Sequence, residues 1–263
     1  MKIEGLIASH GNTQILKGID LVIAPGQVTV IAGPNGCGKS TLLRCMARLH
    51  RPDTGTLSID SQEIWSLSGR EAARRIALLP QSPLTPEGVT VAALVRYGRH
   101  PHQSLFRQWS DADERAVEQA LRDTGTLDLA SRPLEQLSGG QRQRCWLAMV
   151  LAQATPLLLL DEPTSMLDLG HQVEVLELVR TLARNGRQVV IVLHDLGAAA
   201  RYADTLVAMQ AGRIIAAGCP RTIVTPALVR QLYKVDADVL YAPGDSAPVV
   251  MPRARVEPIL KTG

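Results

Sequence analysis

The chain has few aromatic residues and few cysteines for its length. Its 263 residues include one Phe, three Trp and four Tyr, too few to make stacking on nucleic-acid bases a theme of the surface. The four cysteines, at positions 37, 45, 145 and 219, show no C-x-x-C or other metal-ligand spacing, a usage typical of a reducing cytosol. The formal net charge is only +3, which favours neither nucleic acid nor a lipid surface as the main partner.

The sequence also lacks a run that is long and apolar enough to span a membrane. The best candidate, residues 145–160, is interrupted by Gln153, Thr155 and Pro156. Residues 1–5 do not have the charged and then apolar start of a secretory signal. We therefore expect a cytosolic protein that buries its 46% hydrophobic content in one large domain or two lobes.

A glycine-rich segment follows the apolar run 28–32. It reads Gly-Pro-Asn-Gly-Cys-Gly-Lys-Ser-Thr, and the pattern G-x-x-x-x-G-K-S between a buried strand and a helix is typical of a nucleotide-binding P-loop. Glycines let successive backbone N–H groups surround phosphates at the positive end of the following helix, which we expect to run to Leu49. The residues predicted to bind a nucleotide triphosphate are Gly33, Pro34, Asn35, Gly36, Cys37, Gly38, Lys39, Ser40 and Thr41, with Ser40 also a ligand of Mg²⁺.

A second helix start rich in small residues comes about a hundred residues later. Ser138, Gly139, Gly140 and Gln141 precede an apolar, helical run that extends to residue 154. Such a start is either an ordinary helix cap or another contact for phosphate. The motif by itself leaves both interpretations open.

Two carboxylates end a predicted central strand. Residues 157–160 are four leucines bounded by prolines, too short for a helix and typical of a parallel strand buried on both faces. Ligands bind at strand ends in open α/β sheets, so Asp161 is predicted to hold Mg²⁺, directly or through water, and Glu162 to polarise a water for attack on the γ-phosphate. The run 189–193 predicts a neighbouring strand that ends in His194, which we expect to contact the γ-phosphate.

These motifs, in this order, resemble those of the ATP-binding cassette (ABC) ATPases, the motor subunits of ABC transporters, over roughly residues 2–235. The resemblance implies an α/β P-loop NTPase fold: a RecA-like core, an antiparallel β subdomain and an inserted helical subdomain. It implies an ATPase domain over residues 1–242, with core segments 1–87 and 156–242 and a helical signature subdomain over 88–155. We expect residues 243–263 to form a loosely attached C-terminal tail.

The resemblance also implies a role for individual residues. Residues 33–41 look like Walker A and residues 157–162 like Walker B, with Glu162 and His194 as catalytic residues. Gln81 resembles the Q-loop glutamine, which implies a catalytic role and a place among the ligands of Mg²⁺. Residues 138–141 resemble the family signature, which binds ATP in trans, and Asp168 the D-loop aspartate that communicates between protomers. Where the family stacks an aromatic ring on adenine, this chain has His10, which implies weaker stacking.

The implied partners follow from the position of the signature. In this family the signature lies on the helical lobe and does not reach the P-loop of its own chain. A second copy is therefore expected, with two ATP molecules shared across a two-fold dimer. The resemblance further implies separate integral membrane permease subunits, a periplasmic or lipid-anchored substrate-binding protein as an indirect partner, and a peripheral location on the cytoplasmic face of a bacterial inner membrane.

Within the family, the stretches at 97–102, 167–172 and 194–203 look most like the ATPases of ferric-siderophore importers. The sequence thus predicts an ATP-hydrolysing importer subunit for a ferric siderophore, with haem or cobalamin as the alternative cargo. A soluble ATP-driven clamp on nucleic acid or the ribosome is the alternative from another class, but such proteins usually carry two cassettes or a long coiled-coil insertion. A cassette that binds ATP without turnover is disfavoured because Glu162 and His194 are both present.

Overall fold

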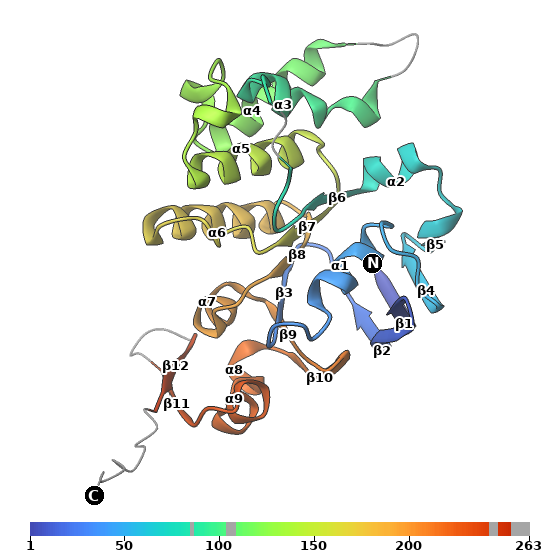
Figure 1. The fold of residues 1–263 in the computed structure, drawn as a ribbon, viewed down its shortest axis with the longest axis vertical. Coiled ribbons are helices and arrows are strands. Elements are labelled where there is room, and N and C mark those ends of the chain that lie inside the picture. Colours follow the sequence, from blue (N-terminus) through green and yellow to red (C-terminus); the bar gives the residue numbers. More distant parts are fainter. Residues whose placement is uncertain (85–86, 104–108, 242–246, 254–263) are drawn as a thin grey trace, which may run out of the picture.

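The computed structural model describes residues 1–84, 87–103, 109–241 and 247–253. A central sheet carries helices on its faces, an antiparallel sheet covers one side near the N-terminus, and a lobe of helices lies at one end (Figure 1). The predicted α/β P-loop fold with an antiparallel β part and an inserted set of helices is confirmed.

The central sheet has six strands in the order β10-β9-β3-β8-β7-β6. Their bounds are β3 (Val28–Ala32), β6 (Ile76–Leu79), β7 (Leu157–Asp161), β8 (Gln188–Val192), β9 (Thr205–Gln210) and β10 (Arg213–Gly218). All neighbours pair in parallel except β10, which pairs antiparallel with β9. Every residue of β3 and β7 is buried, because both faces of these central strands are covered.

The second sheet is antiparallel, in the order β2-β1-β4-β5. Its strands are β1 (Lys2–His10), β2 (Thr13–Val22), β4 (Thr54–Ile59) and β5 (Gln62–Glu63). Its inward residues, such as Leu6 and Ile19, share an apolar core with the helix α1 (Lys39–Met46) and with one face of the central sheet. The predicted continuation of α1 to Leu49 is wrong: Arg48 has a positive φ of 61°, and the side chain of Leu49 is 69% exposed.

The other face of the central sheet shares a core with most of the remaining helices, including the lobe between β6 and β7, whereas Ala72, on the helix 69–75, belongs to the core under the antiparallel sheet. That lobe contains α3 (Val91–Tyr97), α4 (Asp111–Asp123) and α5 (Gly139–Ala152), with 3₁₀ turns at His100–His102, Leu127–Leu129 and Leu134–Gln136. The other helices are α2 (Gly69–Arg75), α6 (Leu169–Arg184), α7 (Leu196–Tyr202), α8 (Pro220–Ile223) and α9 (Pro226–Tyr233), and a 3₁₀ turn covers Ile64–Ser66. Across the described ranges, no helix has both the length and the apolar composition that a membrane crossing needs.

The C-terminal part differs from the expected tail. β11 (Ala237–Tyr241) and β12 (Pro248–Pro252) form an antiparallel hairpin, and Val239 and Val250 pack against the main core. The prediction of a loose tail from residue 243 is therefore wrong for residues 248–252, because alternate residues of this short run bury one apolar face. Residues 243–246 and 254–263 of that predicted tail lie outside the described residues.

Candidate nucleotide-binding and catalytic site

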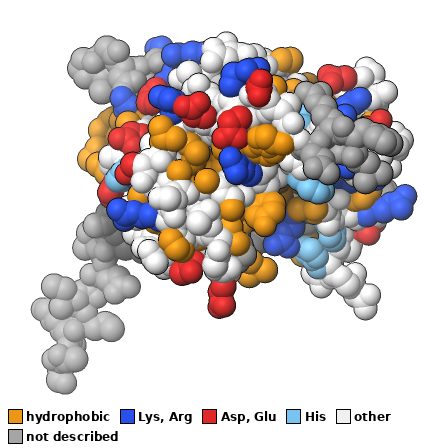
Figure 2. All heavy atoms as spheres, turned by 90° about the horizontal axis from the view of Figure 1, so that it is seen from above, with side chains coloured by type: hydrophobic (Ala, Val, Ile, Leu, Met, Phe, Trp, Pro, Cys, Tyr) orange, Lys and Arg blue, Asp and Glu red, His pale blue; other side chains and the backbone are white. Residues whose placement is uncertain are grey.

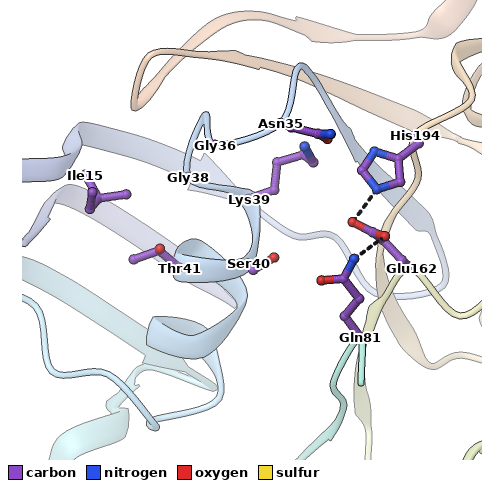
Figure 3. Close-up of a pocket in the computed structure, with 10 residues that line it drawn as sticks. All are labelled: Ile15, Asn35, Gly36, Gly38, Lys39, Ser40, Thr41, Gln81, Glu162 and His194. Atoms are coloured by element: carbon purple, nitrogen blue, oxygen red, sulfur yellow. Dashed lines mark hydrogen bonds and ion pairs between the residues drawn. The ribbon is translucent and has the colours of Figure 1, made fainter. Parts of the chain in front are cut away.

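A cavity of about 370 Å³ opens at the carboxyl ends of β3, β6, β7 and β8, where ligands bind in open α/β sheets. Its walls come from the loop before α1, the segment after β6 and the ends of β7 and β8 (Figure 3). The residues that line it are Ile15, Asn35, Gly36, Gly38, Lys39, Ser40, Thr41, Gln81, Glu162 and His194. Sequence reasoning selected all of them except Ile15, an apolar strand residue whose pattern carries no signal of a site.

The loop before α1 depends on glycine for its path. Gly33 has φ +154°, and a Cβ atom built on it would lie 2.1 Å from the carbonyl oxygen of Met209. Gly38 has φ +107° and is the N-cap residue of α1, so the free N–H groups of the first helical turn face the cavity. Lys39 Nζ donates hydrogen bonds to the carbonyl oxygens of Gly33 and Pro34 at 2.9 and 3.0 Å. The loop therefore offers both N–H donors and a cation to an anionic ligand.

Glu162 lies between two partners from neighbouring strand ends. Its Oε2 accepts a hydrogen bond from Gln81 Nε2 at 2.6 Å, and its Oε1 lies 2.5 Å from His194 Nε2. Figure 3 shows both side chains pointing to the same carboxylate. The residue is only 6% exposed and has φ +52°, a left-handed conformation that is strained for a residue with a side chain. Such strain clusters at functional sites, where the surrounding structure holds the side chain in one place.

Asp161 is the last residue of β7 and is 5% exposed. Burial raises the pKa of its carboxyl above the usual value, and the neighbouring Glu162 charge adds to this, whereas a hydrogen bond with Ser40 acts in the opposite direction. Its Oδ1 is buried and has no hydrogen-bond partner among the described residues. A carboxylate oxygen without a partner next to a hydroxyl is the oxygen donor set that a hard divalent cation prefers, so these residues fit Mg²⁺.

His10 is not among the residues that line the cavity. Its Nε2 lies 3.3 Å from Oγ1 of Thr41, which does line it, so the imidazole stands at the rim. His50 packs beside it, with ring centroids 4.6 Å apart at an angle of 53°. Sequence reasoning missed His50, because nothing in a single histidine after a helix indicates that it meets a residue forty positions earlier.

The structure does not bring the second glycine-containing motif to this cavity. Ser138 is the N-cap of α5 and forms a capping box with Gln141, with Gln141 N to Ser138 Oγ at 3.2 Å and Ser138 N to Gln141 Oε1 at 3.1 Å. Gly139 lines a separate cavity that also contacts Gln81. Gly140 faces Leu167 and Met166, since a Cβ atom on it would lie 3.3 Å from atoms of both.

Asp168 is also outside the cavity, as the N-cap of α6. Its Oδ1 accepts hydrogen bonds from the backbone N–H of His171 at 2.9 Å and from the His171 ring Nδ1 at 2.8 Å. The backbone hydrogen bond from His171 is the largest cause that holds the pKa of this exposed carboxyl below its usual value, and the ring adds to it. Within one chain this aspartate therefore has a capping role.

Residues 16–165 of the chain match the protein-family model of the ABC transporters. Among curated proteins, the chain is 45% identical to a petrobactin import ATP-binding protein of Bacillus anthracis, over 97% of this chain and 94% of that protein. It is equally identical, with the same coverage, to a ferric enterobactin transport ATP-binding protein of Escherichia coli. A hemin import ATP-binding protein of Rhodococcus jostii is 38% identical, over 96% of this chain and 86% of that protein.

Solved structures show the same similarity. An inward-facing structure of a metal-chelate type ABC transporter superposes with a TM-score of 0.82 at 28% identity, covering 97% of both chains. A dimeric bacterial ABC transporter cassette superposes with a TM-score of 0.75 at 26% identity, covering 84% of this chain and 99% of the other.

Proposed function

This chain belongs to the ABC transporter family and is one of its ATP-binding, ATP-hydrolysing subunits, and from this premise we propose that it drives the import of a ferric siderophore through a separate membrane permease. The observation that carries the proposal is the 45% identity, over 97% of the chain, with the ATP-binding proteins of petrobactin and ferric enterobactin transport. Those names refer to two different siderophores, so the proposal extends to the class of cargo and not to one compound.

At the site, we assign the nucleotide phosphates to the loop of residues 33–41. The N–H groups around Gly36 and Gly38 would receive phosphate oxygens, and Lys39 Nζ would exchange its contacts with Gly33 and Pro34 for the β- and γ-phosphates. Such an exchange is favourable because a charge-assisted bond to phosphate is stronger than a bond to a neutral carbonyl.

Glu162 is assigned as the general base. Its carboxylate is fixed by Gln81 and by His194, so one oxygen is placed to accept a proton from a water that attacks the γ-phosphate. His194 would contact the γ-phosphate and steady the carboxylate at the same time. Because Gln81 follows β6 and leads into the helical lobe, a movement of that lobe would change its contact with Glu162.

Ser40 and Asp161 would hold Mg²⁺, with Gln81 as a further oxygen donor. The bound ion would neutralise developing charge on the phosphate oxygens. Of these residues, Asp161 has the clearest fit, since its Oδ1 is buried without a partner among the described residues.

The residues outside the cavity are assigned to a second copy. Ser138, Gly139, Gly140 and Gln141 sit at the free N-terminus of α5 and would contact the γ-phosphate held by the partner's loop, with Asp168 at the same interface. The similarity to a dimeric cassette supports this arrangement. The full assembly would then be a two-fold dimer on a permease at the cytoplasmic face of a bacterial inner membrane, supplied by a substrate-binding protein.

Import of haem is the second candidate, and the hemin import relative favours it at 38% identity. A clamp on nucleic acid receives less support. The face over the helical lobe mixes Lys and Arg with Asp, Glu and apolar side chains (Figure 2), whereas a polyanion is bound by a field of one sign.

Uptake in cells tests the cargo. A strain that lacks this chain would be complemented with the parent or with Glu162→Gln, and uptake of radioiron as ferric siderophores and as hemin, and of labelled cobalamin, would be measured. Siderophore uptake that returns with the parent and not with Glu162→Gln supports the proposal. Restored hemin or cobalamin uptake, with siderophore uptake unaffected by loss of the chain, would replace the proposed cargo with the alternative.

A further inference from the structure

The stretch 97–102 has no part in the nucleotide site, yet it holds the far end of α5. Arg99 Nη1 donates to the carbonyl oxygen of Ala152 at 2.8 Å, and His102 Nε2 donates to that of Gln153 at 2.8 Å. The last carbonyls of an α-helix have no partner within the helix. Two of them at the C-terminus of α5 are therefore satisfied by one short segment.

Arg99 is itself fixed by a buried ion pair. Its Nε donates to Asp113 Oδ1 of α4 at 2.8 Å, and the two residues are 7% and 4% exposed. Burial alone would raise the pKa of Asp113, but hydrogen bonds from Ser110 and Arg99, together with the guanidinium charge, lower it below the usual value. The Asp113 carboxylate is therefore ionised at neutral pH, and its hydrogen bond with Arg99 holds the guanidinium in place as a donor to Ala152.

The same end of α5 is bonded to the core. The side-chain Nε2 of Gln153 donates to the carbonyl oxygens of Ala73 and Ile76, at the end of α2, at 2.5 and 3.0 Å. Arg74 of α2 donates from Nε to the carbonyl oxygen of Pro101 at 2.8 Å. The C-terminus of α5, the segment 97–102 and the C-terminus of α2 thus form one hydrogen-bonded junction between the lobe and the core.

The N-terminal half of α5 packs against Met166 and Leu167 of the core, but among the described residues it makes no hydrogen bond to the core. A cavity of about 210 Å³ separates Gly139, Gln143 and Trp146 from the segment 81–83 of the core. A second cavity, of about 310 Å³, lies between Arg144 and the residues 174–178 of α6. Within the described residues, Gln143 Nε2 and Arg144 Nε are buried with no hydrogen-bond partner, although buried polar groups are normally paired.

We propose that this junction is a pivot: Arg99 and His102 hold the C-terminus of α5 to the segment 97–102, and Gln153 holds it on the end of α2. The helical lobe then turns about this end and displaces mainly the opposite end, which carries Ser138. The inference rests on the proposed function, because it concerns the end of α5 assigned to the partner's nucleotide. The three are positioning residues that act on the reaction through the direction of α5.

The length of α5 sets the size of the effect. Its 14 residues span about 21 Å, so a turn of about 10° at the pivot would move the N-terminal end by about 4 Å. A misplacement of about 1 Å in a group that contacts reacting atoms is enough to lower a rate strongly. The two cavities leave room for this movement at the moving end, and Gln143 Nε2 and Arg144 Nε have no hydrogen bond there that the movement would break.

Gln153→Ala and Arg74→Ala test the pivot, since each removes hydrogen bonds without leaving the buried Asp113 charge alone. Arg96→Ala is the matched control, because it removes an exposed ion pair with Glu114 in the same lobe. We expect Gln153→Ala to lower the ATPase rate by about 5-fold or more, with nucleotide affinity of the isolated subunit within about 2-fold of the parent. Arg96→Ala should leave both unchanged.

A distance measurement separates a pivot from a simple structural bond. Spin labels at Glu118→Cys on α4 and Glu177→Cys on α6, in a chain whose exposed Cys219 is replaced by Ser, report the position of the lobe relative to the core. A broader distance distribution in Gln153→Ala supports the pivot. An unchanged distribution and an unchanged ATPase rate in a folded Gln153→Ala chain would overturn it. If the parent lacks cooperative ATPase activity, the proposed dimer fails, and the distances still test the pivot.

Discussion

Oε1 of Glu162 and Nε2 of His194 lie 2.5 Å apart, although the two residues follow different strands. The contact exists because β7 and β8 are parallel neighbours in register, with Asp161 opposite Val192, so the residues after each strand emerge side by side. The parallel pairing of β6 with β7 likewise brings Gln81, two residues after β6, to the other oxygen of Glu162. The cluster of Gln81, Glu162 and His194 is therefore a product of strand order.

Glu162→Gln should keep nucleotide binding and lose turnover. The amide cannot accept a proton from water, so we expect the ATPase rate to fall by a factor on the order of 10² to 10⁴. Steady-state phosphate release and binding of a fluorescent ATP analogue give the two quantities. Hydrolysis close to the parent rate would remove Glu162 from the role of base.

Removal of Mg²⁺ should abolish hydrolysis. As the pH is lowered, Mg²⁺ binding should weaken at a higher pH than it would with an aspartate of ordinary pKa. Asp161 must be ionised to bind the ion, and burial raises its pKa, so affinity for Mg²⁺ falls as the pH drops through this raised value. Without Mg²⁺, the buried, ionised Asp161 destabilises the folded chain at neutral pH. This cost disappears at acid pH, where the carboxyl is protonated in both the folded and the unfolded chain. Asp161→Asn should then be at least as stable as the parent at pH 7, with the difference shrinking towards acid, as urea unfolding would show.

Ser138→Arg should block the proposed dimer and leave ATP binding by one chain intact. Ser138 lies outside the cavity, at the exposed start of α5, where a long cation would occupy the space of the partner's nucleotide. In size-exclusion chromatography, ATP should convert the Glu162→Gln chain to a dimer. The chain that carries both Glu162→Gln and Ser138→Arg should stay monomeric. Loss of ATP binding by the monomer would contradict a shared site.

His10→Tyr should tighten nucleotide binding. A tyrosine ring offers a larger apolar face to a base than imidazole does, and aromatic pairs contribute about 0.5–1.5 kcal/mol, so affinity should rise roughly 2- to 10-fold. His10→Ala is the complementary change and should weaken adenine nucleotides more than nucleotides with a small base. Equal affinities for all three chains would mean that the rim at His10 and His50 does not contact the base.

Two glycines of the same loop should differ in their tolerance of alanine. Both have positive φ, but a Cβ on Gly36 meets nothing within 4 Å, whereas one on Gly33 would lie 2.1 Å from Met209 O. Gly36→Ala should lower the free energy of unfolding by about 1–2 kcal/mol. Gly33→Ala should cost at least about 2 kcal/mol more, because β9 must move as well. Guanidinium denaturation of both variants measures the difference; equal costs would contradict the close approach.

Local sequence determined the parts of this protein that depend on neighbours along the chain. The loop at residues 33–41 needs glycine at fixed positions, and the leucines at 157–160 form a run too short for a helix between two prolines. Both elements could therefore be predicted without a structure. The helix start at Ser138 is equally local, since its capping box involves a residue three positions away.

Tertiary structure alone decided what depends on residues distant in sequence. The convergence of Gln81 and His194 on Glu162 requires the strand order β6-β7-β8. His10 meets His50 because β4, which begins shortly after His50, pairs with β1. The junction of Arg99 and His102 with the end of α5 left no periodic signal, because single hydrogen bonds to carbonyls impose none. The alternation in β11 and β12 is too short to show from sequence that the two runs pair with each other. Periodicity reveals which face of an element is buried, but not which element covers it.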